Sequence, residues 1–181
     1  MISNAWFSTD YEQNKIFAVV FFIIFSLIVS NYAHRKRLLS PDENRRLMHT
    51  TIGLMMSFST IIFSSKFFPL LLAITFLFFN IIAFKSNLLS GIHSQKRKSY
   101  GTIYFPLSYL VVSYLFWEKN QFVILSLLIL AISDPIAAHI GSGKSSIRKF
   151  KVWHDYKTIN GTIAFFISSI LILVIGNIFI L

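Results

Sequence analysis

Six long apolar blocks are the feature that most limits what this chain can fold into. Each block holds about 17–21 residues, close to the roughly 20 residues that an α-helix needs to cross about 30 Å of hydrocarbon. A backbone that spans a membrane must satisfy its own hydrogen bonds, so we expect these blocks to be helices. The predicted spans are residues 16–33, 47–64, 67–84, 101–117, 121–141 and 162–181.

Lysine and arginine are distributed unevenly between the blocks. The loops after the first, third and fifth blocks contain 14 of the 17 basic residues, and only Lys15, Lys66 and Lys119 lie on the other side. Loops rich in these residues stay in the cytoplasm, so the N-terminus is predicted to lie outside and the three basic loops inside. No cleavable signal peptide is expected, because the basic cluster follows the first apolar block.

The predicted fold class is therefore all-α, a polytopic transmembrane helical bundle of about six spans that forms one integral membrane domain over residues 1–181. The composition agrees, with 55% hydrophobic and 13% charged residues. The net charge of +10 lies in loops between apolar blocks, so topology explains it and no nucleic-acid polymer is expected as a partner. The absence of cysteine excludes disulfides and thiolate chemistry. We expect a bacterial inner-membrane protein.

Two groups of polar residues at the inner ends of spans go beyond what topology requires. Arg45, Arg46 and His49 are three to four residues apart, so they share one helix face and offer donors that suit phosphate. Taken alone, they are better explained as basic residues at a membrane entry, with His49 at the interface. Tyr100, Tyr104 and Pro106 form the second group. A proline inside a span leaves a carbonyl unpaired, so this group predicts the wall of a pocket.

Asp134 is the most informative residue, since a carboxylate inside a span costs at least about 2.5–3.5 kcal/mol and usually has a function. Pro135 next to it interrupts the helix. The alternative role is a structural partner for a basic residue from another span.

Two further groups lie close to Asp134 in the sequence. Residues 138–145 match a loose Walker A pattern, but a P-loop requires a preceding strand, which a membrane helix does not provide. Glycine N–H groups and a lysine can still approach a phosphate, and the candidates are Gly141, Gly143 and Lys144. Lys157, Thr158 and Gly161 precede the last span, where Thr158 is a candidate helix cap.

Together these groups resemble the CTP-dependent lipid kinases, the family of dolichol kinase, phytol kinase and CTP-using diacylglycerol kinase. The resemblance runs from about residue 44 to residue 166. Its motifs are Arg45-Arg46-x-x-His49, Tyr100-Gly101-Thr102-Ile103-Tyr104-Phe105-Pro106, Asp134-Pro135-Ile136-Ala137 with Gly141, and Lys157-Thr158 with Gly161-Thr162. Two positions depart from the family pattern: His139 replaces a second acidic residue, and Asn160 replaces a glutamate.

The resemblance implies transfer of the γ-phosphoryl group of CTP to the hydroxyl of a lipid alcohol, namely a polyprenol, phytol or diacylglycerol. Asp134 would hold Mg²⁺, and either Asp134 or His49 would accept the hydroxyl proton. Lys157 is expected to act in catalysis, while Tyr100, Tyr104 and Pro106 would line the substrate pocket. The residues expected to bind the nucleotide phosphates are Arg45, Arg46, Gly141, Gly143, Lys144, Thr158 and Gly161.

Three other hypotheses stay open. A CTP:phosphatidate cytidylyltransferase also uses CTP in a membrane, but it would release pyrophosphate where a kinase releases CDP. A small transporter is less favoured, because the polar residues gather at one face and no internal repeat is visible. The changes at His139 and Asn160 are also compatible with a non-catalytic membrane homologue.

Overall fold

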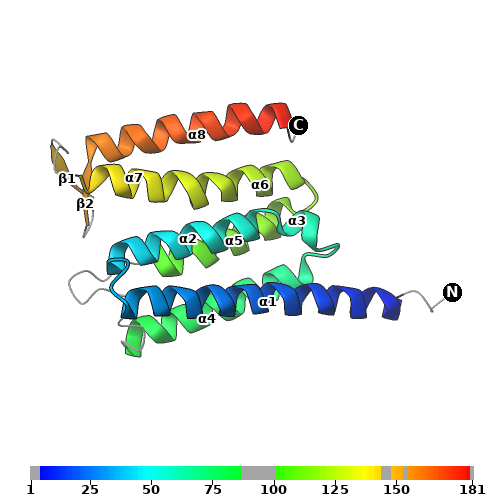
Figure 1. Ribbon diagram of the computed structural model, residues 1–181. Coiled ribbons are helices and arrows are strands. Elements are labelled where there is room, and N and C mark those ends of the chain that lie inside the picture. The colour runs from blue at the N-terminus through cyan, green and yellow to red at the C-terminus, as the bar shows by residue number, and fades with distance from the viewer. Residues whose placement is uncertain (1–4, 87–100, 144–147, 153–154, 180–181) are drawn as a thin grey trace.

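The helices of the protein lie side by side, with their axes along one common direction (Figure 1). We describe a computed structural model, which covers residues 5–86, 101–143, 148–152 and 155–179. The elements are α1 (Ala5–Arg35), α2 (Pro41–Ser57), α3 (Ser59–Ile62), α4 (Phe67–Ser86), α5 (Gly101–Phe116), α6 (Asn120–Leu128), a π-helical turn η1 (Ile129–Ser133), α7 (Asp134–Gly141), β1 (Lys149–Val152), β2 (Asp155–Thr158) and α8 (Ile159–Phe179).

Every predicted apolar block contains a helix, which confirms the prediction of a largely helical protein. Within the described residues, three helical segments are long and apolar enough to cross a membrane. They are Tyr11–Arg35, Asn120–Gly141 and Ile159–Phe179, and the second of them combines α6, η1 and α7. Two shorter apolar helices cover Phe67–Ile82 and Ile103–Phe116.

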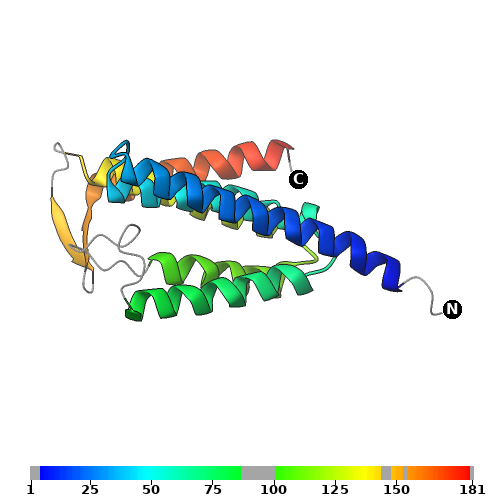
Figure 2. The same cartoon turned by 60° about the horizontal axis from the view of Figure 1, so that its bottom comes forward.

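The two ends of the bundle differ in character. The start of α1 and the end of α8 lie at one end of the bundle, while β1 and β2 lie at the other, as two views show (Figures 1 and 2). We call the second end the hairpin end. There α1 ends, α2 begins, α7 ends and α8 begins, so the polar groups of the second and fifth blocks come together at one end of the molecule.

Helix α2 begins earlier than its apolar block, at Pro41 instead of residue 47. Ser40 and Glu43 form a capping box, in which the Ser40 hydroxyl accepts the Glu43 N–H at 3.3 Å and the Glu43 carboxylate accepts the Ser40 N–H at 2.9 Å. Proline at the first helical position adds to this start signal. The polar first turns of α2 therefore extend beyond the apolar part of the helix.

Among the residues that the structure describes, the hairpin is the one departure from the all-α expectation. Strands β1 and β2 pair antiparallel, with Lys149 opposite Thr158 and Phe150 opposite Lys157. The basic residues in this stretch predict only a loop. An alternation of polar and apolar residues from Lys149 to Val152 was the signal for a strand.

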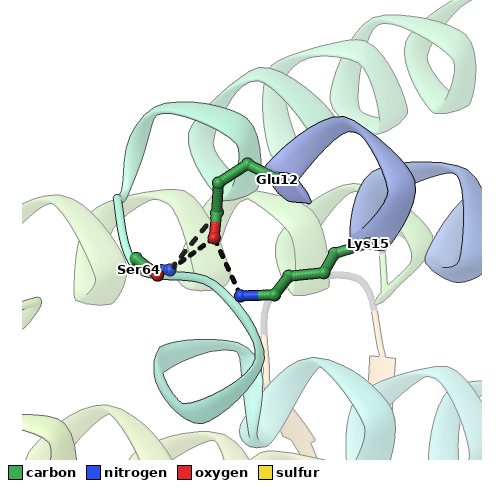
Figure 3. Close-up of polar contacts among 3 residues, drawn as sticks. All are labelled: Glu12, Lys15 and Ser64. Carbon is green, nitrogen blue, oxygen red and sulfur yellow. Dashed lines mark hydrogen bonds and ion pairs between the residues drawn. The ribbon is translucent and has the colours of Figure 1, made fainter. Parts of the chain in front are cut away.

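At the other end of the bundle, Glu12 ties α1 to the segment between α3 and α4 (Figure 3). Its carboxylate is almost fully buried and accepts the Ser64 N–H with both oxygens, at 3.2 and 3.3 Å. The ammonium of Lys15 lies 2.8 Å from the same carboxylate. Because these partners satisfy the carboxylate, Glu12 holds the fold together at the end opposite the candidate site.

Candidate functional site

We call Asn120–Gly141, which combines α6, η1 and α7, the fifth helical segment, and Asp134 lies where its winding changes from π to α. The π-turn η1 ends at Ser133, and α7 begins at Asp134 with Pro135 in its first turn. The Asp134 side chain is exposed on the protein surface. A π-turn inside an α-helix often marks a functional site. The structure thus presents the predicted carboxylate at an irregular point of the helix. The helical rise per residue puts Asp134 about 10 Å before the helix ends at Gly141.

Helix α2 contacts η1 on one side. The His49 ring lies 3.0 Å from the carbonyl oxygen of Leu130, measured at Nε2, and its edge meets the ring of Phe105 with 4.7 Å between centroids. Further along α2, a Cβ on Gly53 would fall 2.6 Å from the Cβ of the fully buried Ala131. Sequence reasoning chose His49 for its charge, whereas the structure places its ring on the backbone of the π-turn.

Helix α8 contacts α7 on the other side, near Gly141 and Gly161. A Cβ on Gly161 would lie 3.3 Å from the Gly141 Cα and 2.9 Å from the Ala137 carbonyl oxygen. The backbones of the two helices therefore approach closely, as small residues permit in membrane proteins. The structure brings these two predicted residues together as a packing contact.

Thr158 caps α8, as the sequence predicted. Its hydroxyl accepts the Gly161 N–H at 3.2 Å and lies 3.5 Å from the Gly141 carbonyl oxygen. The residue is buried, so its hydroxyl is used within the protein. We therefore give Thr158 and Gly161 a supporting role, which joins the start of α8 to the end of α7.

The two arginines of α2 are half-buried at the hairpin end. Arg45 lies 3.7 Å from the carboxylate of Asp42 on the same helix. The pKa of Glu43 is held below its usual value of 4.5, first by the hydrogen bonds from Ser40 and then by the charges of Arg46 and His139. Helix α7, which carries the exposed His139, also contacts α2.

Lys157 is exposed on β2, immediately before the cap of α8. The base of the hairpin is closed by Arg148, whose carbonyl accepts the Ile159 N–H at 3.4 Å. Gly143 is exposed just after α7 and donates its N–H to the Ile140 carbonyl at 3.2 Å. The predicted site residues Tyr100 and Lys144 lie outside the described residues.

Helix α5 meets the site through a residue that sequence reasoning did not single out. Tyr104 is 52% exposed, and Pro106 is buried inside the helix. Phe105 lies between them and contacts the His49 ring. Asn44 is a second missed residue: it is almost fully buried, and its side-chain oxygen accepts the Ser30 hydroxyl of α1 at 2.9 Å.

An apolar groove of about 470 Å³ lies between the fifth helical segment and α8. It begins at Ile129, the first residue of η1, and follows α6 away from the hairpin end as far as Phe122. By helical rise, the distance from Asp134 to Phe122 is about 18 Å. The residues that line the groove are Phe122, Leu125, Ser126, Ile129, Leu173, Val174 and Asn177.

The donor set fits Mg²⁺ only if substrate phosphates complete it. Within the described part of the chain, no three His, Cys, Asp or Glu side chains group closely enough to hold a metal ion. Asp134 is an exposed single carboxylate. Mg²⁺ commonly binds one or two carboxylates together with phosphate oxygens and water. Asp134 therefore suits a metal that arrives with a nucleotide.

Comparison with known proteins finds a relative in an archaeon. The chain is 33% identical over 138 residues to the uncharacterized protein MJ1137 of Methanocaldococcus jannaschii, an alignment that covers 71% of this chain and 69% of the archaeal protein. No family model matches the chain. No solved structure matches it either.

Proposed function

Because this chain belongs to the family of the uncharacterized Methanocaldococcus jannaschii protein, whose name assigns no activity, we propose its function from the site itself. We propose a membrane lipid kinase that transfers the γ-phosphoryl group of CTP to the hydroxyl of a polyprenol, phytol or diacylglycerol. The observation that carries the proposal is the exposed carboxylate of Asp134 at the end of a π-turn, in the segment whose sequence resembles these kinases.

Phosphoryl transfer requires mainly positioning and charge neutralisation from the protein. Asp134 would hold Mg²⁺, which when bound neutralises charge on the triphosphate. Arg45, Arg46 and Lys157 belong to the hairpin end, where their cations would stabilise the charge that develops during transfer. Lys144, which follows Gly143 in the sequence, would add a further cation.

The lipid hydroxyl would reach Asp134 from the membrane side. The groove that begins at Ile129 supports this arrangement, because its apolar lining can receive a hydrocarbon chain whose hydroxyl lies near η1. Leu125 and Leu173 are part of that lining. Asp134 would then accept the proton of the hydroxyl as the new O–P bond forms and CDP leaves.

For the topology we propose six spans, with the N-terminus outside and the hairpin end in the cytoplasm. The three long apolar helices support part of this arrangement. The common position of both described chain ends supports an even number of crossings (Figure 1). Cytoplasmic CTP would then meet the arginines of α2 directly.

The test uses purified protein in mixed micelles with Mg²⁺ and γ-labelled CTP. Polyprenols, phytol and diacylglycerol are offered separately as acceptors. We expect label in an organic-phase lipid and release of CDP. Asp134→Asn should reduce the rate at least about 100-fold, the scale of losing one electrostatic contact to a phosphoryl transition state. Glu118→Gln removes an exposed carboxylate between α5 and α6 and should leave the rate unchanged.

The products separate the competing functions. Pyrophosphate release with formation of a CDP-lipid would identify a cytidylyltransferase and reject the kinase. Wild-type activity in Asp134→Asn would reject the assigned role of this carboxylate. If the protein neither labels a lipid nor binds CTP with Mg²⁺, the non-catalytic hypothesis replaces the kinase.

A further inference from the structure

In the π-turn η1, the backbone carbonyl of Leu130 lacks its helical partner. In a π-turn each N–H bonds the carbonyl five residues earlier. The carbonyl of Leu130 therefore requires the N–H of residue 135, which is a proline and has none. A carbonyl inside a membrane protein that lacks a donor costs free energy, so another group must supply one.

His49 supplies that donor from α2. Its Nε2 lies 3.0 Å from the Leu130 oxygen, and a carbonyl can only accept, so Nε2 carries the proton. The ring cannot turn freely, because its edge rests against Phe105. The close contact of Gly53 with Ala131 also fixes the distance between α2 and η1.

We infer that His49 is a positioning residue: its ring N–H replaces the N–H that Pro135 lacks, holds η1 in the π form, and so sets the direction in which Asp134 projects. This role differs from the proton acceptor that the sequence suggested as one option for His49. This inference extends the proposed function. Only its prediction about kinase activity rests on that function.

The packing against α8 explains why the π form matters. Leu125 contacts Gly176 at one end of this interface, and Gly141 contacts Gly161 at the other. The two contacts are 16 residues apart on the fifth helical segment but 15 residues apart on α8. The wider π-turn η1 accommodates the one additional residue of the fifth helical segment. A helix turns by about 100° per residue. If η1 reverted to α-helix, α7 would rotate by about that angle, and Asp134 with it.

A thermal unfolding cycle tests the hydrogen bond without using enzyme activity. His49→Leu removes the donor, whereas His49→Gln keeps an N–H near the position of Nε2. We expect Tm to fall by about 2–8 °C in His49→Leu, on the scale of about 2–4 °C per kcal/mol for a chain of this size. His49→Gln should recover most of that loss.

Adding Pro135→Ala tests whether the effect of His49→Leu depends on the N–H that Pro135 lacks, because alanine restores that N–H. In that background His49→Leu should lower Tm by less than half as much as in the wild type. An equal loss in both backgrounds would overturn the proposal. The proposal also fails if His49→Gln is as unstable as His49→Leu.

Thiol labelling reads the helix register directly, because the natural chain has no cysteine. Ala137 is half-buried and its carbonyl faces Gly161, whereas Ala138 is exposed. Single cysteines at these positions should label slowly and rapidly, respectively. In His49→Leu the Ala137→Cys rate should rise toward that of Ala138→Cys, and in His49→Gln it should not. An unchanged rate in His49→Leu would show that His49 does not hold the register.

The kinase assay separates positioning from proton transfer. A positioning role predicts that His49→Gln keeps kcat within about threefold, while His49→Leu loses at least about tenfold, the lower range for groups that orient a metal ligand. Equal loss of kcat in both variants would make His49 the proton acceptor and overturn the inference. If the wild type shows no kinase activity, the proposed function fails, while the unfolding and labelling results still decide the role of His49.

Discussion

A Cβ atom added to Gly53 would lie 2.6 Å from the Cβ of Ala131, closer than two such atoms approach in real proteins. Ala131 is fully buried in η1, so it cannot move away into solvent. The pair sets how closely α2 approaches the turn that presents Asp134. Helix contacts of this kind allow specific tests of the packing.

Gly53→Ala should destabilise the protein by about 1–3 kcal/mol, the usual cost of adding a methyl group to a filled core. Thermal unfolding in detergent micelles measures the change. The double variant Gly53→Ala with Ala131→Gly returns the space and should recover part of the loss. Equal destabilisation in the single and double variants would show that another contact, such as Phe105, determines the effect.

Gly161→Ala should also destabilise by about 1–3 kcal/mol, because two of the three atoms nearest to the added Cβ are backbone atoms of α7 that cannot rotate away. The nearest is the Ala137 carbonyl oxygen at 2.9 Å. Gly143→Ala is a matched control, since Gly143 is exposed and its nearest neighbour would lie at 3.3 Å. Similar unfolding temperatures for the two variants would contradict the close approach of α7 and α8.

Thr158→Ala should cost about 0.5–2 kcal/mol, the range measured for the loss of a helix N-cap. The lost interaction is the bond from the Gly161 N–H to the Thr158 hydroxyl. Thr158→Ser keeps the hydroxyl and should retain most of the stability. Slower amide hydrogen exchange at Gly161 in Thr158→Ser than in Thr158→Ala would confirm the cap. Equal exchange in the two variants would argue against it.

Glu12→Ala should destabilise by about 1.5–3 kcal/mol, the range for a hydrogen bond to a charged group, because it removes the carboxylate that accepts the Ser64 N–H. Glu12→Gln keeps an acceptor oxygen and should lose less. Gln13→Ala, which alters an exposed neighbour, is the control and should change unfolding by no more than about 0.5 kcal/mol. Identical unfolding of Glu12→Ala and Gln13→Ala would remove the assigned role from Glu12.

Glu43 should make the free energy of unfolding depend on pH, and the sign of this dependence follows from its pKa. Its pKa is lowered in the folded protein by the Ser40 hydrogen bonds, so the ionised form stabilises the fold. That contribution is present above the usual pKa of 4.5 and is lost as the pH falls through the lower folded value. Glu43 precedes the predicted span that begins at residue 47.

The difference in unfolding free energy between wild type and Glu43→Gln should therefore be largest near neutral pH and vanish in acid. Glutamine can still form the capping box, so the comparison isolates the charge. Urea titrations between pH 3 and pH 7 measure it. A difference that stays constant across this range would contradict the assigned shift.

The sequence predicted the helices because long apolar blocks have few alternatives in a bilayer. The apolar block marks only the apolar part of α2, because the helix start depends on Ser40 and Glu43, a local capping signal that hydropathy does not register. Sequence reasoning missed the hairpin because the charges of Lys149 and Lys151 dominate a stretch with only four residues per strand.

For the candidate site, residue type alone identified Asp134 as unusual and Thr158 as a cap. The sequence could not show that His49 faces the carbonyl of Leu130, since that contact joins residues 81 positions apart. Nor could it show η1, because Pro135 is compatible with a kink as well as with a π-turn. Both features depend on how α2 packs against the fifth segment.

The last residue of β2, Thr158, is followed directly by the first residue of α8, Ile159, and no linker separates strand from helix. The Arg148 carbonyl also bonds the first N–H of α8, so the hairpin is tied to the helix at two points. The hairpin and the start of α8 therefore move together. Because Gly161 in that start packs against Gly141 of α7, a ligand that displaces the hairpin would act first on the contact between α7 and α8.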